Sequence, residues 1–303
     1  MKRKVLVIVG PTGVGKTSLS IQIAKTFHGE IISGDAYQIY QGLSIGTAKI
    51  TEQEMEGIPH ALVDCVPYDH DYSVMEFQKR AREIIHHCAD DILPIVCGGT
   101  GLYIKSLLYD YVFTEETKDQ DYMKFLSSLS NSKLIACLNH VDPNAWKTIH
   151  PNNRKRIIRA LEIAHSGKRK SEKIEEQSHT MVYDAFIIGL TMDRNQLYAR
   201  IDARVDQMMK QGLAEEVKRL VKQDKNIWNR QSFQSIGYKE WQAYFSGECD
   251  IDTCITQIKK NSRNFAKRQY TWFRNQMHVN WYDIEQMDWK EQLFSAINEW
   301  INR

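Results

Sequence analysis

The sequence predicts an α/β protein, with a parallel sheet flanked by helices and an inserted all-helical subdomain. Short β-branched apolar runs alternate with segments of helical periodicity, and glycine turns join two of the runs directly to a helix. One long interval, 111–184, contains helical periodicity but no strand-like run. The expected strands are residues 4–9, 30–33, 61–65, 92–97, 185–190 and 279–282.

The helical pattern divides the chain into a core and an insertion. Apolar residues recur at helical spacing over three long segments, 74–89, 197–208 and 254–273. The expected domains are a core made of 1–110 and 185–303, and an inserted helical subdomain at 111–184.

The composition is that of an ordinary globular protein, with 303 residues, 42% of them hydrophobic and 26% charged. No apolar run approaches the ~18 residues that a membrane-spanning helix needs, so no membrane association is expected. The six cysteines form no CxxC pair and lack zinc-ligand spacing. We therefore expect core thiols in a reducing compartment, and a cytoplasmic protein.

Positive charge is concentrated in two segments, although the net charge is only +2. Residues 152–170 contain seven basic side chains and one acidic side chain, and residues 259–274 contain six basic side chains and no acid. The rest of the chain is therefore acidic overall. This asymmetry indicates a polyanionic partner, although one such helix alone is usually just a solvated face.

Helical geometry places the basic side chains of the second segment together. At 100° per residue, four of them lie within about 60° of one another, opposite Ile258, Phe265 and Trp272. These four are Lys260, Arg263, Lys267 and Arg274. In the first segment, Ile157 and Ile158 belong to an apolar stripe that leaves the charges outward. We therefore expect both helices to present a cationic face to a nucleic acid.

A phosphate-binding loop follows the first strand and begins the first helix. It matches the pattern GxxxxGK[ST] of P-loop NTPases and consists of Gly10, Pro11, Thr12, Gly13, Val14, Gly15, Lys16 and Thr17. Its backbone N–H groups, the helix N-terminus and Lys16 are suited to a diphosphate. The hydroxyl of Thr17 is the predicted ligand for Mg²⁺.

Three polar residues at strand ends are candidates for the chemistry. Asp35 follows the second strand and is either a general base or a turn-capping aspartate. Thr100 precedes a helix and is either a site residue or its N-cap. Asp64 ends the third expected strand and is either a ligand of Mg²⁺ through water or an ordinary loop residue.

Together, these motifs resemble the tRNA dimethylallyltransferase family over nearly the whole chain. The P-loop is generic, but the ordered set is specific. The quoted segments are GPTGVGKT (10–17), ISGDAYQIYQGLSIGTAK (32–49), GIPHALVD (57–64), YSVMEFQKRA (72–81), GGTGLY (98–103), RIIRALE (156–162), RIDARVDQMMKQGLAEEV (200–217), SIGYKE (235–240) and AKRQYTWFR (266–274). Some members have a C-terminal zinc finger, and this chain resembles the shorter bacterial form.

The resemblance implies a function and a set of site residues. The P-loop would hold the diphosphate of dimethylallyl diphosphate, and Asp35 would be the catalytic aspartate. The target nucleotide in the tRNA would contact Asp35, Ala36, Tyr37 and Gln38, with Thr100 close by. The anticodon stem-loop would contact the inserted subdomain, including Lys155, Arg156, Ile157, Ile158 and Arg159. A monomer suffices for this chemistry.

Three other functions remain open on the residues alone. A P-loop kinase of a small metabolite would explain the loop and Asp35, but not the two basic helices. A prenyltransferase acting on free adenine nucleotides would not need the inserted subdomain. A non-catalytic RNA-binding switch would bind tRNA without transferring a group to it.

Overall fold

The computed structural model describes residues 2–111, 113, 119–167 and 180–303. Contacts divide it into two units, 1–108 with 181–303 and 109–180, which we describe separately. The expected boundaries of the insertion, 111 and 184, differ from this division by a few residues. Asp184 belongs to the larger unit because it pairs with Lys4 in the sheet.

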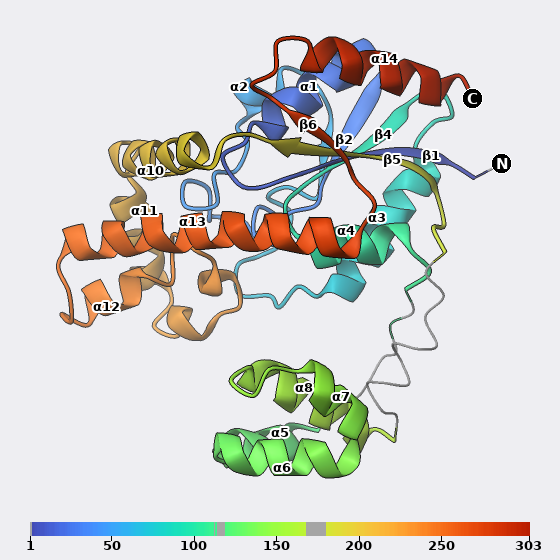
Figure 1. Ribbon diagram of the computed structural model, residues 1–303. Helices are drawn as coiled ribbons and strands as arrows, with labels where there is room; N and C mark the ends of the chain where they lie inside the picture. Colours follow the sequence, from blue (N-terminus) through green and yellow to red (C-terminus); the bar gives the residue numbers. More distant parts are fainter. Residues whose placement is uncertain (1, 112, 114–118, 168–179) are drawn as a thin grey trace. The chain divides into compact units, whose positions relative to one another are not determined.

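A six-stranded parallel sheet with the order β3-β2-β4-β1-β5-β6 is the centre of the larger unit (Figure 1). Residues Val5 to Val9 of β1 are fully buried, as expected for a central parallel strand that is covered on both faces. The strands are β1 (Lys4–Val9), β2 (Gly29–Ser33), β3 (His60–Ala61), β4 (Leu93–Cys97), β5 (Asp184–Thr191) and β6 (Asn280–Asp283).

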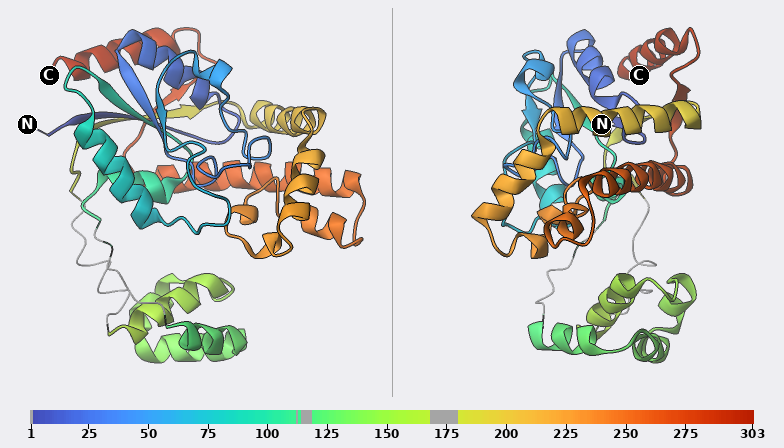
Figure 2. Two further views of the ribbon diagram at one scale, coloured as in Figure 1. Left: turned by 180° about the vertical axis from the view of Figure 1, so that it is seen from behind. Right: turned by 90° about the vertical axis from the view of Figure 1, so that its left-hand side faces the viewer.

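Helices cover both faces of the sheet and extend past the carboxyl ends of its strands. In Figure 1, α1 and α14 lie on one face, and α3, α4 and α13 lie on the other. Figure 2 shows α10 and α11 beyond the sheet, and α10 packs along α13. The helices are α1 (Lys16–Thr26), α2 (Glu52–Met55), α3 (Val74–His87), α4 (Gly101–Leu108), α10 (Arg194–Lys210), α11 (Leu213–Gln223), α12 (Trp241–Phe245), α13 (Ile251–Gln276) and α14 (Trp289–Ile301), with 3₁₀ turns η1 (Ile227–Asn229) and η2 (Ser232–Gln234).

The third strand is shorter than its apolar sequence predicts. The expected strand covered 61–65, but β3 contains only His60–Ala61. Leu62 and Asp64 adopt positive φ angles of 59° and 51°, which end the extended conformation. The first expected strand coincides with β1, and the other four differ from the structure by one residue at one or both ends.

The smaller unit is all-helical and has its own hydrophobic core. Its helices are α5 (Gln120–Ser128), α6 (Asn131–Val141), α7 (Pro143–Thr148) and α8 (Arg154–His165). At the start of each helix, an N-cap side chain accepts a hydrogen bond from a backbone N–H of the first turn. Asp119 accepts from Tyr122 N, for example, and Ser130 accepts from Lys133 N. Leu126, Leu134, Leu138 and Ile157 form the centre of the core.

The cysteines are all free, but only Cys254 is fully buried. Cys65 and Cys137 are exposed, so the expectation of six core thiols is wrong for these two. Cys65 lies beyond the end of β3, directly after the positive-φ residue Asp64. In the described part of the chain, no helix combines the length and apolar character needed to cross a membrane.

Candidate active site

The glycine loop lies between β1 and α1, where its sequence predicts it. Gly10, Gly13 and Gly15 have φ angles of 143°, 82° and 105°, which side chains disfavour. A Cβ atom on Gly10 would also lie 2.9 Å from the carbonyl oxygen of Leu190. Gly15 precedes α1 without a capping side chain, so the first N–H groups of the helix remain for an anion.

Lys16 lines a cavity of about 580 Å³. Its Nζ donates to the carbonyl oxygen of Pro11 at 2.8 Å. Burial lowers the pKa of Lys16 to about 8, and the nearby Cys97 and Asp35 partly oppose this shift. The charged and hydroxyl side chains lining the cavity are Lys16, Thr17, Ser18, Lys25, Arg200, Arg204, Glu54 and Glu56.

The two carboxylate oxygens of Asp35 have different surroundings. Oδ1 accepts hydrogen bonds from the backbone N–H groups of Tyr37 at 2.9 Å and Gln38 at 3.3 Å. Asp35 therefore does cap a turn. Within the described residues, Oδ2 accepts no hydrogen bond, and Asp35 lines a second cavity. One oxygen thus holds the turn, while the other keeps its lone pairs for a proton.

The loops after β2 and β4 touch, which brings Thr100 beside the Asp35 turn. A Cβ atom on Gly98 would lie 2.3 Å from the carbonyl oxygen of Gly34, so only glycine permits this approach. The hydroxyl of Thr100 accepts from the N–H of Ala36 at 3.1 Å. This hydroxyl therefore connects the two loops, rather than serving only the helix that follows it.

Gln38 is held by the loop that follows it in the sequence. Its Nε2 donates to the carbonyl oxygens of Thr47 at 3.3 Å and Ala48 at 3.0 Å. Both amide hydrogens are thus engaged. A paired amide contact between Gln38 and a nucleobase would require Gln38 to exchange these bonds.

Two residues that the sequence did not single out connect α10 and α13 to the glycine loop. Nη1 of Arg204 lies 3.4 Å from the hydroxyl of Thr12, and Arg204 lines both cavities. Burial lowers the pKa of Arg204, while the charges of Asp35 and Glu54 raise it. Gln269 accepts from Thr12 N at 2.9 Å and donates to the carbonyl oxygen of Gly99 at 3.0 Å. Both residues lie in the segments 200–217 and 266–274, but nothing in those segments alone indicates these contacts.

The second cavity, of about 470 Å³, contains Asp35 and Thr100 and has a largely apolar wall. Trp272 packs so closely on Gly101 that a Cβ atom there would lie 2.2 Å from its ring. Ile258, Phe265 and Trp272, on the side of α13 opposite its basic residues, all line this cavity. The apolar wall consists of Ile201, Val205, Met208, Ile258, Phe265 and Trp272.

The basic face of α13 is smaller than its sequence predicts. Lys260, Lys267 and Arg274 are exposed. Arg263 is only partly exposed, because its Nη1 lies 2.5 Å from both carboxylate oxygens of Asp202 on α10. The charge of Arg263 is therefore already paired within the protein, and its contact with a nucleic acid stays a prediction.

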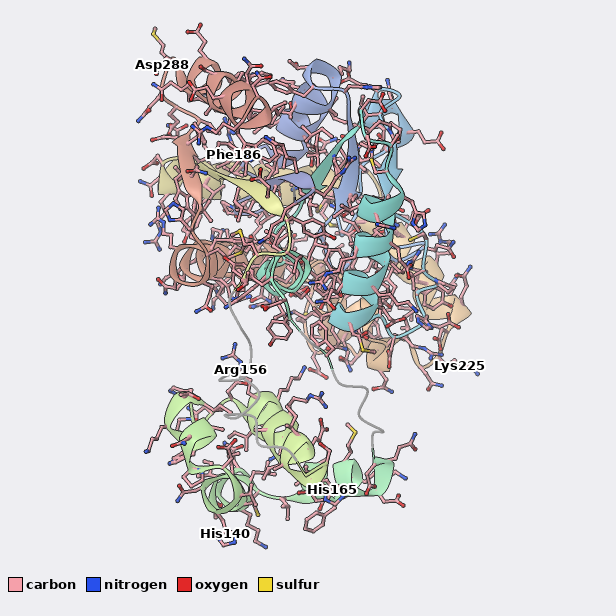
Figure 3. The ribbon with its side chains drawn as sticks, turned by 90° about the vertical axis from the view of Figure 1, so that its right-hand side faces the viewer. His140, Arg156, His165, Phe186, Lys225 and Asp288 are labelled. Carbon is pink, nitrogen blue, oxygen red and sulfur yellow. The ribbon has the colours of Figure 1, made fainter. Side chains whose placement is uncertain are left out.

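On α8, the basic side chains point outward and the apolar side chains inward. Lys155, Arg156 and Arg159 are exposed, and Figure 3 labels Arg156 near the start of the helix. Ile157 is fully buried in the core of the smaller unit, and Ile158 is partly buried. The expected contact of tRNA with Ile157 is thus corrected, because its side chain is not accessible. The basic residues Lys168, Arg169 and Lys170 of the same segment lie outside the described residues.

Asp64 does not line the cavity of the glycine loop. Its carboxylate forms an ion pair with Lys49 instead. The expectation that Asp64 helps bind Mg²⁺ therefore has no geometric support. Within residues 2–111, 113, 119–167 and 180–303, no group of three or more His, Cys, Asp or Glu side chains is placed to hold a metal. A metal at Thr17 would need further oxygen ligands, from substrate or water.

Comparison with known proteins identifies the family. The model of the family described as IPP transferase matches residues 38–276, and that described as isopentenyl transferase matches residues 3–66. The chain belongs to the IPP transferase family. An IPP transferase relative, the tRNA dimethylallyltransferase of Bacillus subtilis (strain 168), is 52% identical over 289 residues, which cover 93% of this chain and 91% of the relative.

Solved structures of IPP transferase relatives have the same fold. The tRNA delta(2)-isopentenylpyrophosphate transferase of Staphylococcus epidermidis is 44% identical, with a TM-score of 0.73 and coverage of 98% of this chain and 99% of that chain. A eukaryotic dimethylallyltransferase acting on tRNA is 32% identical, with a TM-score of 0.85 and coverage of 99% and 80%. The resemblance found in the sequence motifs is thereby confirmed.

Proposed function

We propose that this chain transfers the dimethylallyl group of dimethylallyl diphosphate to the exocyclic amino nitrogen of the adenine 3′-adjacent to the anticodon in tRNA. The observation that best supports this is the pair of cavities that both include Arg204. One contains the glycine loop and several cations, and the other contains Asp35 and an apolar wall. The first suits a diphosphate, and the second suits a prenyl chain and a nucleobase.

Asp35 acts as the general base in the proposed reaction. An adenine amino group is a poor nucleophile because its lone pair is delocalised into the ring. As the nitrogen bonds to the allylic carbon, the bond from this carbon to the diphosphate oxygen breaks. Oδ2 of Asp35 takes the proton that the nitrogen loses. The products are the prenylated adenine and diphosphate, with no covalent enzyme intermediate.

The glycine loop stabilises the leaving group. Negative charge increases on the diphosphate as the allylic carbon separates from it, and Lys16, Arg204 and the loop N–H groups lie around the cavity that would hold it. The hydroxyl of Thr17 and the diphosphate oxygens are hard oxygen ligands that fit Mg²⁺. When bound, Mg²⁺ would neutralise part of the charge on the leaving diphosphate.

Exposed basic residues bind the tRNA in this proposal. Single-stranded loops can present unstacked bases, and moving one base into a pocket costs only a few kcal/mol. The phosphate contacts come from two groups of side chains, Lys155, Arg156 and Arg159 on α8 and Lys260, Lys267 and Arg274 on α13. The protein acts as a monomer in the cytoplasm.

Incubation with labelled dimethylallyl diphosphate and bulk tRNA, followed by nucleoside analysis, tests the proposal. We expect label in a modified adenosine of tRNA, and none in free adenine nucleotides offered instead. Parallel reactions with ATP and small alcohols test the kinase alternative. Productive ATP cleavage without transfer of the prenyl label, or tRNA binding without any transfer, would refute the proposed function.

A further inference from the structure

Glu216 of α11 is a buried carboxylate that lines neither cavity. Its Oε2 accepts from Ser44 N at 3.1 Å and from Ile45 N at 3.0 Å, and its Oε1 lies 3.4 Å from Gly46 N. The hydroxyl of Tyr238 also donates to Oε1. Among the described residues, no lysine or arginine forms an ion pair with Glu216. The burial of this charge is therefore compensated by N–H and O–H donors.

Tyr238 and Gly237 hold the same loop at Gly46. The buried Tyr238 hydroxyl accepts from Gly46 N at 3.1 Å while it donates to Glu216. Burial raises the pKa of Tyr238, and the charge of Glu216 raises it further, so the hydroxyl stays protonated. A Cβ atom on Gly46 would lie 2.4 Å from the Tyr238 ring, and one on Gly237 would lie 2.9 Å from Gly46 O. The loop thus has little room to move.

The loop held by Glu216 and Tyr238 leads directly to Asp35. Gly46, Thr47 and Ala48 line the same cavity as Asp35. The carbonyl oxygens of Thr47 and Ala48 accept from the Gln38 amide, and Gln38 N donates to Oδ1 of Asp35. Hydrogen bonds, joined by the backbone of loop 44–48 and by the Gln38 side chain, therefore connect Glu216 to the proposed base.

We propose that Glu216 and Tyr238 are positioning residues for the transfer reaction, which act by holding loop 44–48, and through this loop Gln38, so that Asp35 faces the acceptor base. This inference rests on the proposed function. It requires the negative charge of Glu216, because every group that faces this carboxylate is a donor. An amide at this position would present its own N–H groups to at least one of those donors.

The variants Glu216→Gln and Tyr238→Phe test the inference, with Glu215→Gln as the control. Glu215 is the exposed neighbour on the same helix, so its variant loses the same charge without touching the loop. We expect kcat with saturating tRNA and dimethylallyl diphosphate to fall roughly 100-fold in Glu216→Gln, because the Asp35 carboxylate would be displaced from its reactive position. Binding of dimethylallyl diphosphate is expected to stay within about twofold of the wild type, because the glycine loop is unchanged.

A double-mutant cycle with Gln38→Ala separates positioning from general stabilisation. If Glu216 acts through Gln38, the double variant loses little more activity than the worse single variant. Three results would overturn the inference. The losses of kcat in the double variant could be additive, both single variants could keep the wild-type kcat, or donor binding could fall as much as turnover. If Glu216→Gln does not fold, the same measurements of kcat and donor binding on Tyr238→Phe decide, because this variant removes only one hydroxyl. Failure of wild-type protein to transfer the group would refute the proposed function instead.

Discussion

Asp35 combines a structural and a chemical role in the proposed reaction because its two oxygens face different neighbours. Oδ1 caps the turn of Tyr37 and Gln38, which fixes the direction of the side chain. The sequence left open whether Asp35 is a turn residue or a base. These interpretations do not compete in the structure, because a carboxylate has enough lone pairs for both roles.

Replacing Asp35 with Asn or Ala distinguishes these roles. Asn keeps an acceptor for the turn but cannot take a proton, whereas Ala loses both functions. We expect Asp35→Asn to lose about 100- to 10,000-fold in turnover while it retains tRNA binding and thermal stability. Asp35→Ala is expected to lose a similar amount of turnover and also some stability. Steady-state kinetics, tRNA binding and thermal unfolding provide the measurements, and full activity in Asp35→Asn would exclude the base role.

The pKa of Lys16 predicts a pH dependence of donor binding. Burial lowers this pKa to about 8 in the free protein, and a bound diphosphate favours the protonated lysine. Below this pH, Lys16 is already charged. Above it, binding requires proton uptake, so the affinity for dimethylallyl diphosphate falls by up to about tenfold per pH unit.

Calorimetric titration without tRNA on either side of pH 8 measures this effect on donor binding. The control is Lys16→Arg, whose guanidinium stays protonated throughout. Its binding is expected to be weaker at neutral pH but nearly independent of pH. The same inflection in both proteins would assign the pH dependence to another group.

At the scale of elements, the sequence predicts those parts of the site whose residues follow one another in the chain. The β1 strand, the glycine loop and the start of α1 follow one another, so their geometry is local. Gln269 meets Thr12 across 257 residues of sequence. Its role arises from the packing of α13 against the sheet. Helical periodicity predicts which side of α13 is buried, but not which residues that side contacts. Arg204 and Glu216 were missed for the same reason.

Gln269 is expected to fix the relative positions of the glycine loop and the loop after β4. Its amide both accepts from Thr12 N and donates to Gly99 O, which a carboxylate cannot do. We expect Gln269→Glu to lower the free energy of unfolding by about 1–3 kcal/mol and to weaken donor binding.

Urea unfolding and titration with dimethylallyl diphosphate test the role of Gln269. Gln276→Glu is a matched control on the same helix, because the Gln276 side-chain oxygen already faces Lys105 at 3.2 Å. A loss of stability as large in the control as in Gln269→Glu would argue against a specific role for this amide.

At the scale of the whole chain, charge counted along the sequence overstates the charge available to a partner. Two of the six basic residues in 259–274 are paired with α10, since Arg263 contacts Asp202 and Lys259 lies 2.6 Å from Asp206. Such pairs connect helices distant in sequence, so composition alone does not reveal them. The basic residues that remain exposed on α8 and α13 are the better candidates for phosphate contacts.

Removal of charge from α8 tests whether this helix binds tRNA phosphates. Lys155 and Arg156 are exposed, and neither belongs to the core of the smaller unit. Each phosphate contact releases counterions, so the log–log salt dependence of tRNA affinity should flatten by roughly 0.7 to 0.9 per charge removed. We therefore expect Lys155→Gln/Arg156→Gln to bind tRNA more weakly at low salt and with a shallower salt slope. The control Lys290→Gln/Arg303→Gln removes two charges near the end of the chain. Identical slopes for the α8 variant and the wild type would exclude these side chains as phosphate contacts, whatever the change in affinity at one salt concentration.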